Sequence, residues 1–84
     1  MTQTNLLDLK FKKEYSEEKD WHYYVYDLTD GVTLISPASD EVVDDNWFVC
    51  IMETSPEVEF NDLKELKQFI NLVEKNKRKS LTLN

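Results

Sequence analysis

Apolar and charged side chains alternate near the start of the chain, over residues 6–15. Leu7, Leu9, Phe11 and Tyr15 fall on one side of an extended backbone, and charged residues occupy most of the positions between them. Because successive side chains of a β-strand point to opposite faces, this period of two predicts a strand that is buried on one face only.

Two further strand-like segments flank the dipeptide Asp30-Gly31 and predict a β-hairpin. The segments are residues 21–28, which are rich in Trp and Tyr, and residues 32–36. Asp-Gly between such segments favours a two-residue type I′ turn, because both residues tolerate the positive φ angles that this turn requires. A turn of this type sets the register by pairing Thr29 with Val32, Asp27 with Leu34 and Tyr26 with Ile35.

The second half of the chain changes from strand-like to helical patterns. Residues 37–46 are predicted to form an exposed loop, because they carry four acids and a proline. Residues 47–53 follow without alternation, which is typical of a strand covered on both faces, and we place this strand centrally in the sheet. Apolar side chains then recur at helical spacing over residues 61–77, with Asn61 as the expected N-cap, and residues 80–84 form a tail.

These elements predict a single α+β domain over residues 1–84. The expected architecture is an antiparallel sheet of about four strands, in the order β-β-β-β-α, covered on one face by a single C-terminal helix. One helix cannot cover both faces of the sheet, whereas the pattern of residues 47–53 is typical of a strand that is covered on both. We therefore expect the second face to bind something, such as a second copy of the chain, unless the loop 37–46 folds over it.

The charge of the chain is unevenly distributed, and its net value is −7. No Lys or Arg occurs from Asp20 through Leu63, a stretch that holds eleven acids, and six of the ten basic residues follow it. Such a field repels nucleic-acid backbones and attracts basic partners. Nucleic acid is therefore not the expected partner, and a basic protein is.

Catalytic and cofactor chemistry are not expected from these residue types. His22 and Cys50 are the sole histidine and cysteine, and Cys50 lies in the most apolar run of the chain, where a thiol is inert. Two such side chains cannot supply the three or four ligands of a zinc site. The acids of residues 40–45 lack the spacing of a calcium loop, and Gly31 as the only glycine excludes a glycine-rich phosphate loop. We predict no enzyme activity, no metal and no cofactor.

The expected location is the cytoplasm, without membrane contact. The N-terminus has no basic region followed by an apolar stretch, so it does not read as a signal peptide. The longest apolar run, residues 47–52, is far shorter than the roughly 20 residues of a membrane helix. A single cysteine also allows no internal disulfide, although small secreted domains usually carry several.

The leading functional hypothesis is a small acidic, non-enzymatic protein-binding domain. Such a domain would act as an inhibitor or immunity-type protein, placing carboxylates where phosphates sit in the basic, nucleic-acid-binding site of a partner. Aromatic side chains would anchor the contact. The alternatives are a self-associating structural domain that forms a homodimer, and single-stranded nucleic-acid binding through sheet aromatics. The residues predicted to bind the partner are Asp40, Glu41, Asp44, Asp45, Glu53, Glu57 and Glu59 for charge, and Trp21, Tyr24 and Trp47 as anchors.

Overall fold

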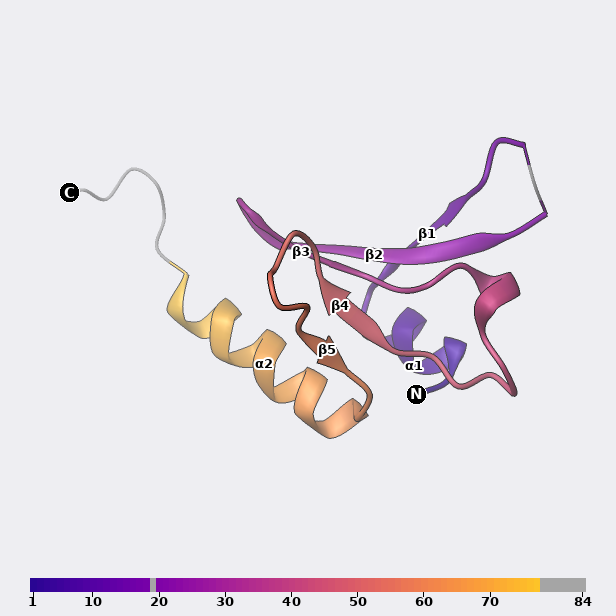
Figure 1. The fold of residues 1–84 in the computed structure, drawn as a ribbon. Helices are drawn as coiled ribbons and strands as arrows, with labels where there is room; N and C mark the ends of the chain where they lie inside the picture. The colour runs from indigo at the N-terminus through magenta and orange to yellow at the C-terminus, as the bar shows by residue number, and fades with distance from the viewer. Residues whose placement is uncertain (19, 78–84) are drawn as a thin grey trace.

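The computed structural model describes residues 1–18 and 20–77 of the chain. They form a five-stranded antiparallel sheet with helices, so the predicted α+β class is confirmed, with a strand count close to the expected four. Each strand pairs with the next one along the chain (Figure 1). The predicted tail at residues 80–84 lies outside the described residues. In chain order the elements are α1 (Gln3–Asp8), β1 (Lys12–Tyr15), β2 (His22–Thr29), β3 (Val32–Ile35), the 3-10 helix η1 (Ser39–Glu41), β4 (Val49–Ile51), β5 (Glu59–Phe60) and α2 (Leu63–Asn76).

The strand predicted over residues 6–15 begins only at Lys12, and a helix, α1, precedes it. The side chain of Thr2 caps this helix by accepting a hydrogen bond from the Asn5 N–H at 3.2 Å, and the Asn5 side chain accepts one from the Thr2 N–H at 2.8 Å. Lys10 then adopts a φ of 75°, which ends the helix and redirects the chain into β1. The alternation of apolar residues over so short a run therefore fitted both a strand and a helix with Leu6 on its buried face.

The β2–β3 hairpin forms where it was predicted, but its register differs by one residue beyond the turn. Thr29 pairs with Val32 as expected, whereas a bulge between Asp27 and Thr29 pairs Tyr26 with Leu34 instead of Ile35. Only Gly31 of the turn has a positive φ, of 81°, so the turn is not type I′. The shift places Leu34 on the same face as Tyr26, where it is fully buried.

The later elements are shorter than predicted. The strand predicted over residues 47–53, with a central place in the sheet and cover on both faces, is reduced to β4. It is fourth in a sheet of five, between β3 and β5, and the α-helices cover only one of its faces. The helix predicted over residues 61–77 is α2, and its N-cap is Asp62 instead of Asn61. The Asp62 carboxylate accepts a hydrogen bond from the Glu65 N–H at 3.0 Å, which satisfies a backbone donor of the first turn.

Both α-helices lie on the same face of the sheet, which we call the covered face (Figure 1). One helix was expected there, and α1 is the second. Between this face and the helices lies the core, which joins residues of both helices to Tyr24 and Leu28 of β2 and to Val49 of β4. The core residues are Leu6, Phe11, Tyr24, Leu28, Leu34, Trp47, Val49, Leu66 and Ile70.

The opposite side of the sheet, which we call the open face, has neither α-helix against it. One row of side chains crosses it from edge to edge, because cross-strand partners share a face. In order from β1 to β5, this row is Lys12, Val25, Ile35, Cys50 and Glu59. Its ends are charged and exposed, and its centre is apolar and half-buried.

Candidate functional site

The open face carries a stripe of aromatic and apolar side chains. Tyr23 and Val25 on β2 point to this face, as does Trp21 just before the strand, because they occupy alternate positions. Ile35 and Cys50 extend the stripe across β3 and β4. All five side chains, which we call the open-face stripe, are half-buried. Antiparallel sheets usually expose polar side chains on an uncovered face, so an apolar stripe here is a candidate binding surface.

A shallow groove of about 370 Å³, which we call the Trp21 groove, lies between the stripe and the segment that follows β3. The segment is held in place because the His22 N–H donates a hydrogen bond to Ser39 Oγ at 3.0 Å. The predicted loop 37–46 thus contains η1 and borders the open face instead of covering it. The groove is lined by Trp21, Tyr23 and Ile35 from the stripe and by Ser36, Pro37, Ala38 and Glu41 from the segment.

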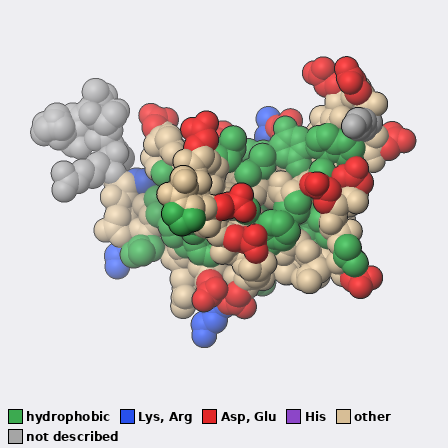
Figure 2. Space-filling model, viewed as in Figure 1, with side chains coloured by type: hydrophobic (Ala, Val, Ile, Leu, Met, Phe, Trp, Pro, Cys, Tyr) green, Lys and Arg blue, Asp and Glu red, His purple; other side chains and the backbone are tan. Residues whose placement is uncertain are grey.

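Carboxylates border the open-face stripe at several points. Glu41 lines the Trp21 groove. Glu14, Glu17 and Glu18 line a neighbouring hollow together with Trp21 and Tyr23. Figure 2 shows hydrophobic side chains gathered in the middle of its view, with acidic side chains among and around them and few basic ones. The open face therefore has an apolar centre, and carboxylates lie on its border.

Basic side chains on this face lie at the β1 edge. Lys12 occupies the end of the cross-strand row, and its Nζ lies 3.3 Å from Glu14 Oε2. Because both side chains are exposed, this ion pair contributes at most about 1 kcal/mol to stability. It does, however, offset the charge of Lys12 locally. Lys10 lies at the same edge, near Val25 and Asp27.

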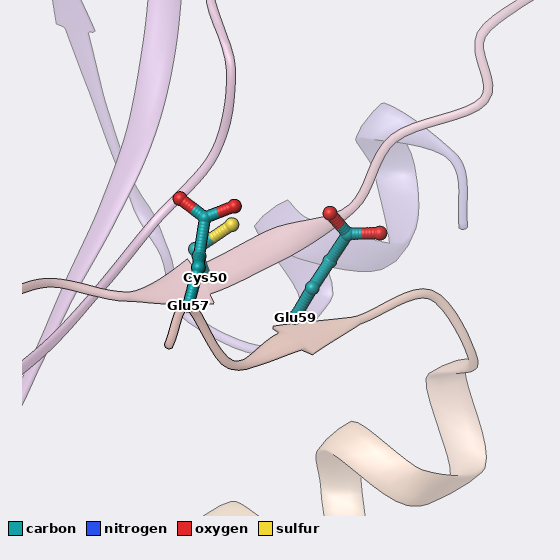
Figure 3. Close-up of side chains that lie close together, drawn as sticks. All are labelled: Cys50, Glu57 and Glu59. Atoms are coloured by element: carbon teal, nitrogen blue, oxygen red, sulfur yellow. The ribbon is translucent and has the colours of Figure 1, made fainter. Parts of the chain in front are cut away.

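Cys50, Glu57 and Glu59 converge beside β4 and β5. Figure 3 shows their side chains pointing to the same side of the sheet, away from α2. The sulfur and one carboxylate oxygen of each glutamate lie within 4.8 Å of one another, the one group of three potential metal ligands among residues 1–18 and 20–77. Burial, followed by the charge and hydrogen bonding of Glu57, raises the pKa of the Cys50 thiol to about 11. At neutral pH the thiol is therefore protonated, which disfavours both metal ligation and nucleophilic attack.

His22 lies on the covered face, on the other side of the sheet from Cys50. Its Nε2 lies 2.7 Å from Gln3 Oε1, and its ring stacks on Trp47 with the centroids 5.8 Å apart. Burial, with a smaller contribution from Lys13, lowers the pKa of His22 below its ordinary value. His22 and Cys50 therefore do not form a nucleophile and base pair.

The seven acids predicted to bind a partner are all exposed, but they do not form one cluster. Glu41, Glu57 and Glu59 border the open-face stripe. Asp45 Oδ1 instead accepts hydrogen bonds from Trp47 Nε1 at 2.7 Å and from the Gln3 N–H at 3.2 Å, which ties the loop to the N-terminus. The remaining three, Asp40, Asp44 and Glu53, lie in η1 or in turns, and the last two have positive φ angles.

The prediction of three aromatic anchors needs correction. Tyr24 is fully buried and Trp47 is only 4% exposed, so neither side chain can anchor a partner without unfolding. Each satisfies its polar atom internally, Tyr24 with Gln3 and Trp47 with Asp45. Trp21 remains available, and Tyr23, which the sequence reasoning missed, contacts it with the ring centroids 5.9 Å apart. Successive side chains of a strand point to opposite faces, and this rule places Tyr23 and Tyr24 of β2 on opposite faces of the sheet.

Comparison of this chain with protein families, with curated proteins and with solved structures finds no match. Within the part of the chain that the structure describes, neither α-helix has the length and apolar character that crossing a membrane requires. The geometry of the open face is therefore the basis for the functional proposal.

Proposed function

We propose that this chain is a small acidic, non-enzymatic protein-binding domain that docks a basic partner protein on its open face. The observation that carries the proposal is the open-face stripe, an uncovered apolar surface bordered by Glu41, Glu57 and Glu59. Trp and Tyr are the side chains that most often supply binding energy at the centre of a protein interface. Trp21 and Tyr23 take that role here, and the carboxylates select a partner of opposite charge.

The charge of the border favours a basic partner over a second copy of the chain. A dimer that joined two open faces would bring the carboxylates of both copies together, and like charges across an interface cost several kcal/mol. The uncovered apolar stripe is still what a self-associating domain would need, so a homodimer is the second candidate. Sedimentation at high micromolar concentration separates the two, because the docking proposal expects a monomer and the dimer proposal does not.

The proposed biological role is inhibition of a basic, nucleic-acid-binding site. Carboxylates beside aromatic rings compete for the Lys and Arg side chains that otherwise hold phosphates and bases. Direct binding of single-stranded nucleic acid would need a basic groove around Trp21 and Tyr23, whereas carboxylates surround them. Of the basic residues near the C-terminus, Lys77 pairs with Glu74 at 2.6 Å, and Arg78 and Lys79 lie outside the described residues.

The proposal is tested by titrating the chain against a panel of purified basic nucleic-acid-binding proteins, with core histones as the first member. Binding is expected at low salt and should weaken steeply as the ionic strength rises, because the screening length shrinks to about 10 Å at 0.1 M. A labelled DNA duplex should be displaced from those proteins in the same range of concentration.

Charge-neutral variants assign the binding to one face. The double variant Glu57→Gln with Glu59→Gln removes two carboxylates from the border of the open face, and Glu65→Gln removes one from α2 on the other side. The first should bind the basic proteins more weakly and depend less on salt, and the second should bind as the unaltered chain does. The proposal fails if no member of the panel binds, or if both variants lose affinity equally.

A further inference from the structure

We infer that the Trp21 groove is the subsite for an arginine side chain of the partner protein. This inference rests on the proposed function, because it names the anchor that a basic partner would insert. The groove combines two aromatic rings, an apolar wall and one carboxylate within a single hollow. These groups suit an arginine side chain. The rings can stack on its guanidinium, the apolar wall can contact its aliphatic stem, and the carboxylate can pair with its charge.

The aromatic side of the groove consists of Trp21 and Tyr23. Their rings are inclined at 48° to one another, with centroids 5.9 Å apart, and both side chains are half-buried without being sealed. A planar guanidinium can stack on either face, and Trp is the strongest cation–π partner among the aromatic residues. A phosphate or carboxylate ligand would gain nothing from these rings, and no Lys or Arg is among the residues that line the groove.

The acidic side of the groove is Glu41. Its Oε1 accepts one long hydrogen bond from the Ala38 N–H, at 3.3 Å, and its side chain is exposed. The carboxylate can therefore still accept from the forked N–H groups of a guanidinium. An uncharged apolar ligand would instead desolvate this carboxylate without compensation, which is unfavourable.

The wall of the groove is held in place before any ligand arrives. Ser36 Oγ accepts a hydrogen bond from the Tyr24 N–H at 2.8 Å and donates one to Pro37 O at 2.9 Å. The bond from the His22 N–H to Ser39 Oγ fixes the next turn. A preformed site avoids the cost of ordering a loop on binding, which strengthens a small contact.

The test is a titration of the isotope-labelled full chain, followed by NMR, with N-acetyl-arginine amide as the probe. N-acetyl-citrulline amide, a neutral molecule of nearly the same shape, and N-acetyl-lysine amide are the comparison probes. The arginine probe should give saturable shifts at the Trp21 indole and at Tyr23, Ile35 and Ala38, with a Kd on the order of millimolar. The citrulline probe should bind about tenfold more weakly, because it lacks the charge.

Two variants localise the effect. Glu41→Gln keeps an oxygen for the Ala38 N–H and removes the charge, so the arginine probe should bind it about tenfold more weakly. Glu65→Gln removes a carboxylate from α2, on the other side of the sheet and outside the groove, and should leave the Kd unchanged. The native pattern of amide shifts confirms that each variant is folded.

The inference is overturned if the arginine probe gives no saturable shifts, if citrulline or lysine binds as tightly, or if both variants respond equally. If the histone titration still depends on Glu57 and Glu59, such a result removes the arginine subsite and keeps the proposed docking of basic proteins. Conversely, a saturable arginine site in a chain that binds no basic protein would remove the proposed function and keep the subsite.

Discussion

The two faces of the sheet present neighbouring residues of the same strands to opposite environments. Tyr24 points to the covered face and is fully buried, with its hydroxyl bonded to Gln3. Tyr23, one residue earlier, points to the open face and stays half-buried against Trp21. The aromatic residues of β2 therefore divide into two sets. One set of rings builds the core, and the other remains available for contact.

Polar and charged groups also differ between the two faces of the sheet. On the covered face, the polar atoms that reach the core, such as those of Tyr24 and Trp47, are satisfied by internal hydrogen bonds. On the open face, the border carries carboxylates around a protonated thiol. A stable core cannot tolerate unpaired charges, whereas a binding surface uses them to select its partner.

The two faces should differ most in how much their side chains contribute to the free energy of unfolding. Substitutions of Leu34 and Ile35, adjacent residues of β3, measure this difference. Leu34→Ala removes a fully buried side chain and should lower the free energy of unfolding by about 2–5 kcal/mol. Ile35→Ala removes a half-buried one and should cost about 1 kcal/mol. Urea unfolding of both variants gives the two values. Equal losses would mean that the open face is covered in solution, for example by a second copy of the chain.

The next contrast is chemical and concerns Cys50. A pKa of about 11, against an ordinary value of 9.0, reduces the thiolate fraction at pH 8 about a hundredfold. A disulfide reagent should therefore modify Cys50 about tenfold to a hundredfold more slowly than a small model thiol, because the greater nucleophilicity of a more basic thiolate offsets part of the loss. Glu57→Gln should speed the reaction, because it removes a charge that opposes the thiolate, and Glu65→Gln should not. A rate equal to that of the model thiol would contradict the arrangement of Cys50 and Glu57.

The smallest effect is expected at His22, on the covered face. Burial, with Lys13, lowers its pKa in the folded chain, so the unfolded chain binds more protons once the pH falls below about 6.5. His22 therefore contributes stability that is present above pH 6.5 and is lost as the pH falls toward the folded-state pKa. Unfolding free energies measured from pH 7.5 to pH 5 should decline, and His22→Gln should flatten the decline. An unchanged slope in that variant would assign the pH dependence to other groups.

Sequence patterns predicted the class of fold because the strongest patterns were long or chemically specific. Apolar spacing in α2 extends over several turns, and Asp30-Gly31 marks the hairpin. The pattern over residues 6–15 failed because a short alternating run fits a strand and a helix equally. The helix forms instead of the strand because Thr2 caps its N-terminus and because Lys10 adopts a left-handed backbone conformation, which depends on the contacts of the folded chain.

The candidate binding surface was predictable only in part. Charge counting identified an acidic middle of the chain, and Trp21, Glu41, Glu57 and Glu59 do border one surface. Which aromatics stay outside depends on the face that the helices cover, and the bulge in β2 sets which side chains of β3 share that face. The proximity of Cys50 to the two glutamates requires the pairing of β4 with a strand of only two residues, which no local pattern indicates.

The most direct test of the central claim compares Tyr23→Ala with Leu72→Ala in binding to a basic nucleic-acid-binding protein. Tyr23 lies on the open face, whereas Leu72 lies on α2, is 61% exposed and faces solvent on the opposite side of the molecule. Tyr23→Ala should raise the Kd at low salt about thirtyfold, the loss typical of an aromatic anchor, and Leu72→Ala should leave the Kd within about twofold of its original value. Loss of binding in Leu72→Ala, with Tyr23→Ala unaffected, would rule out docking on the open face and move the interface to the helical side.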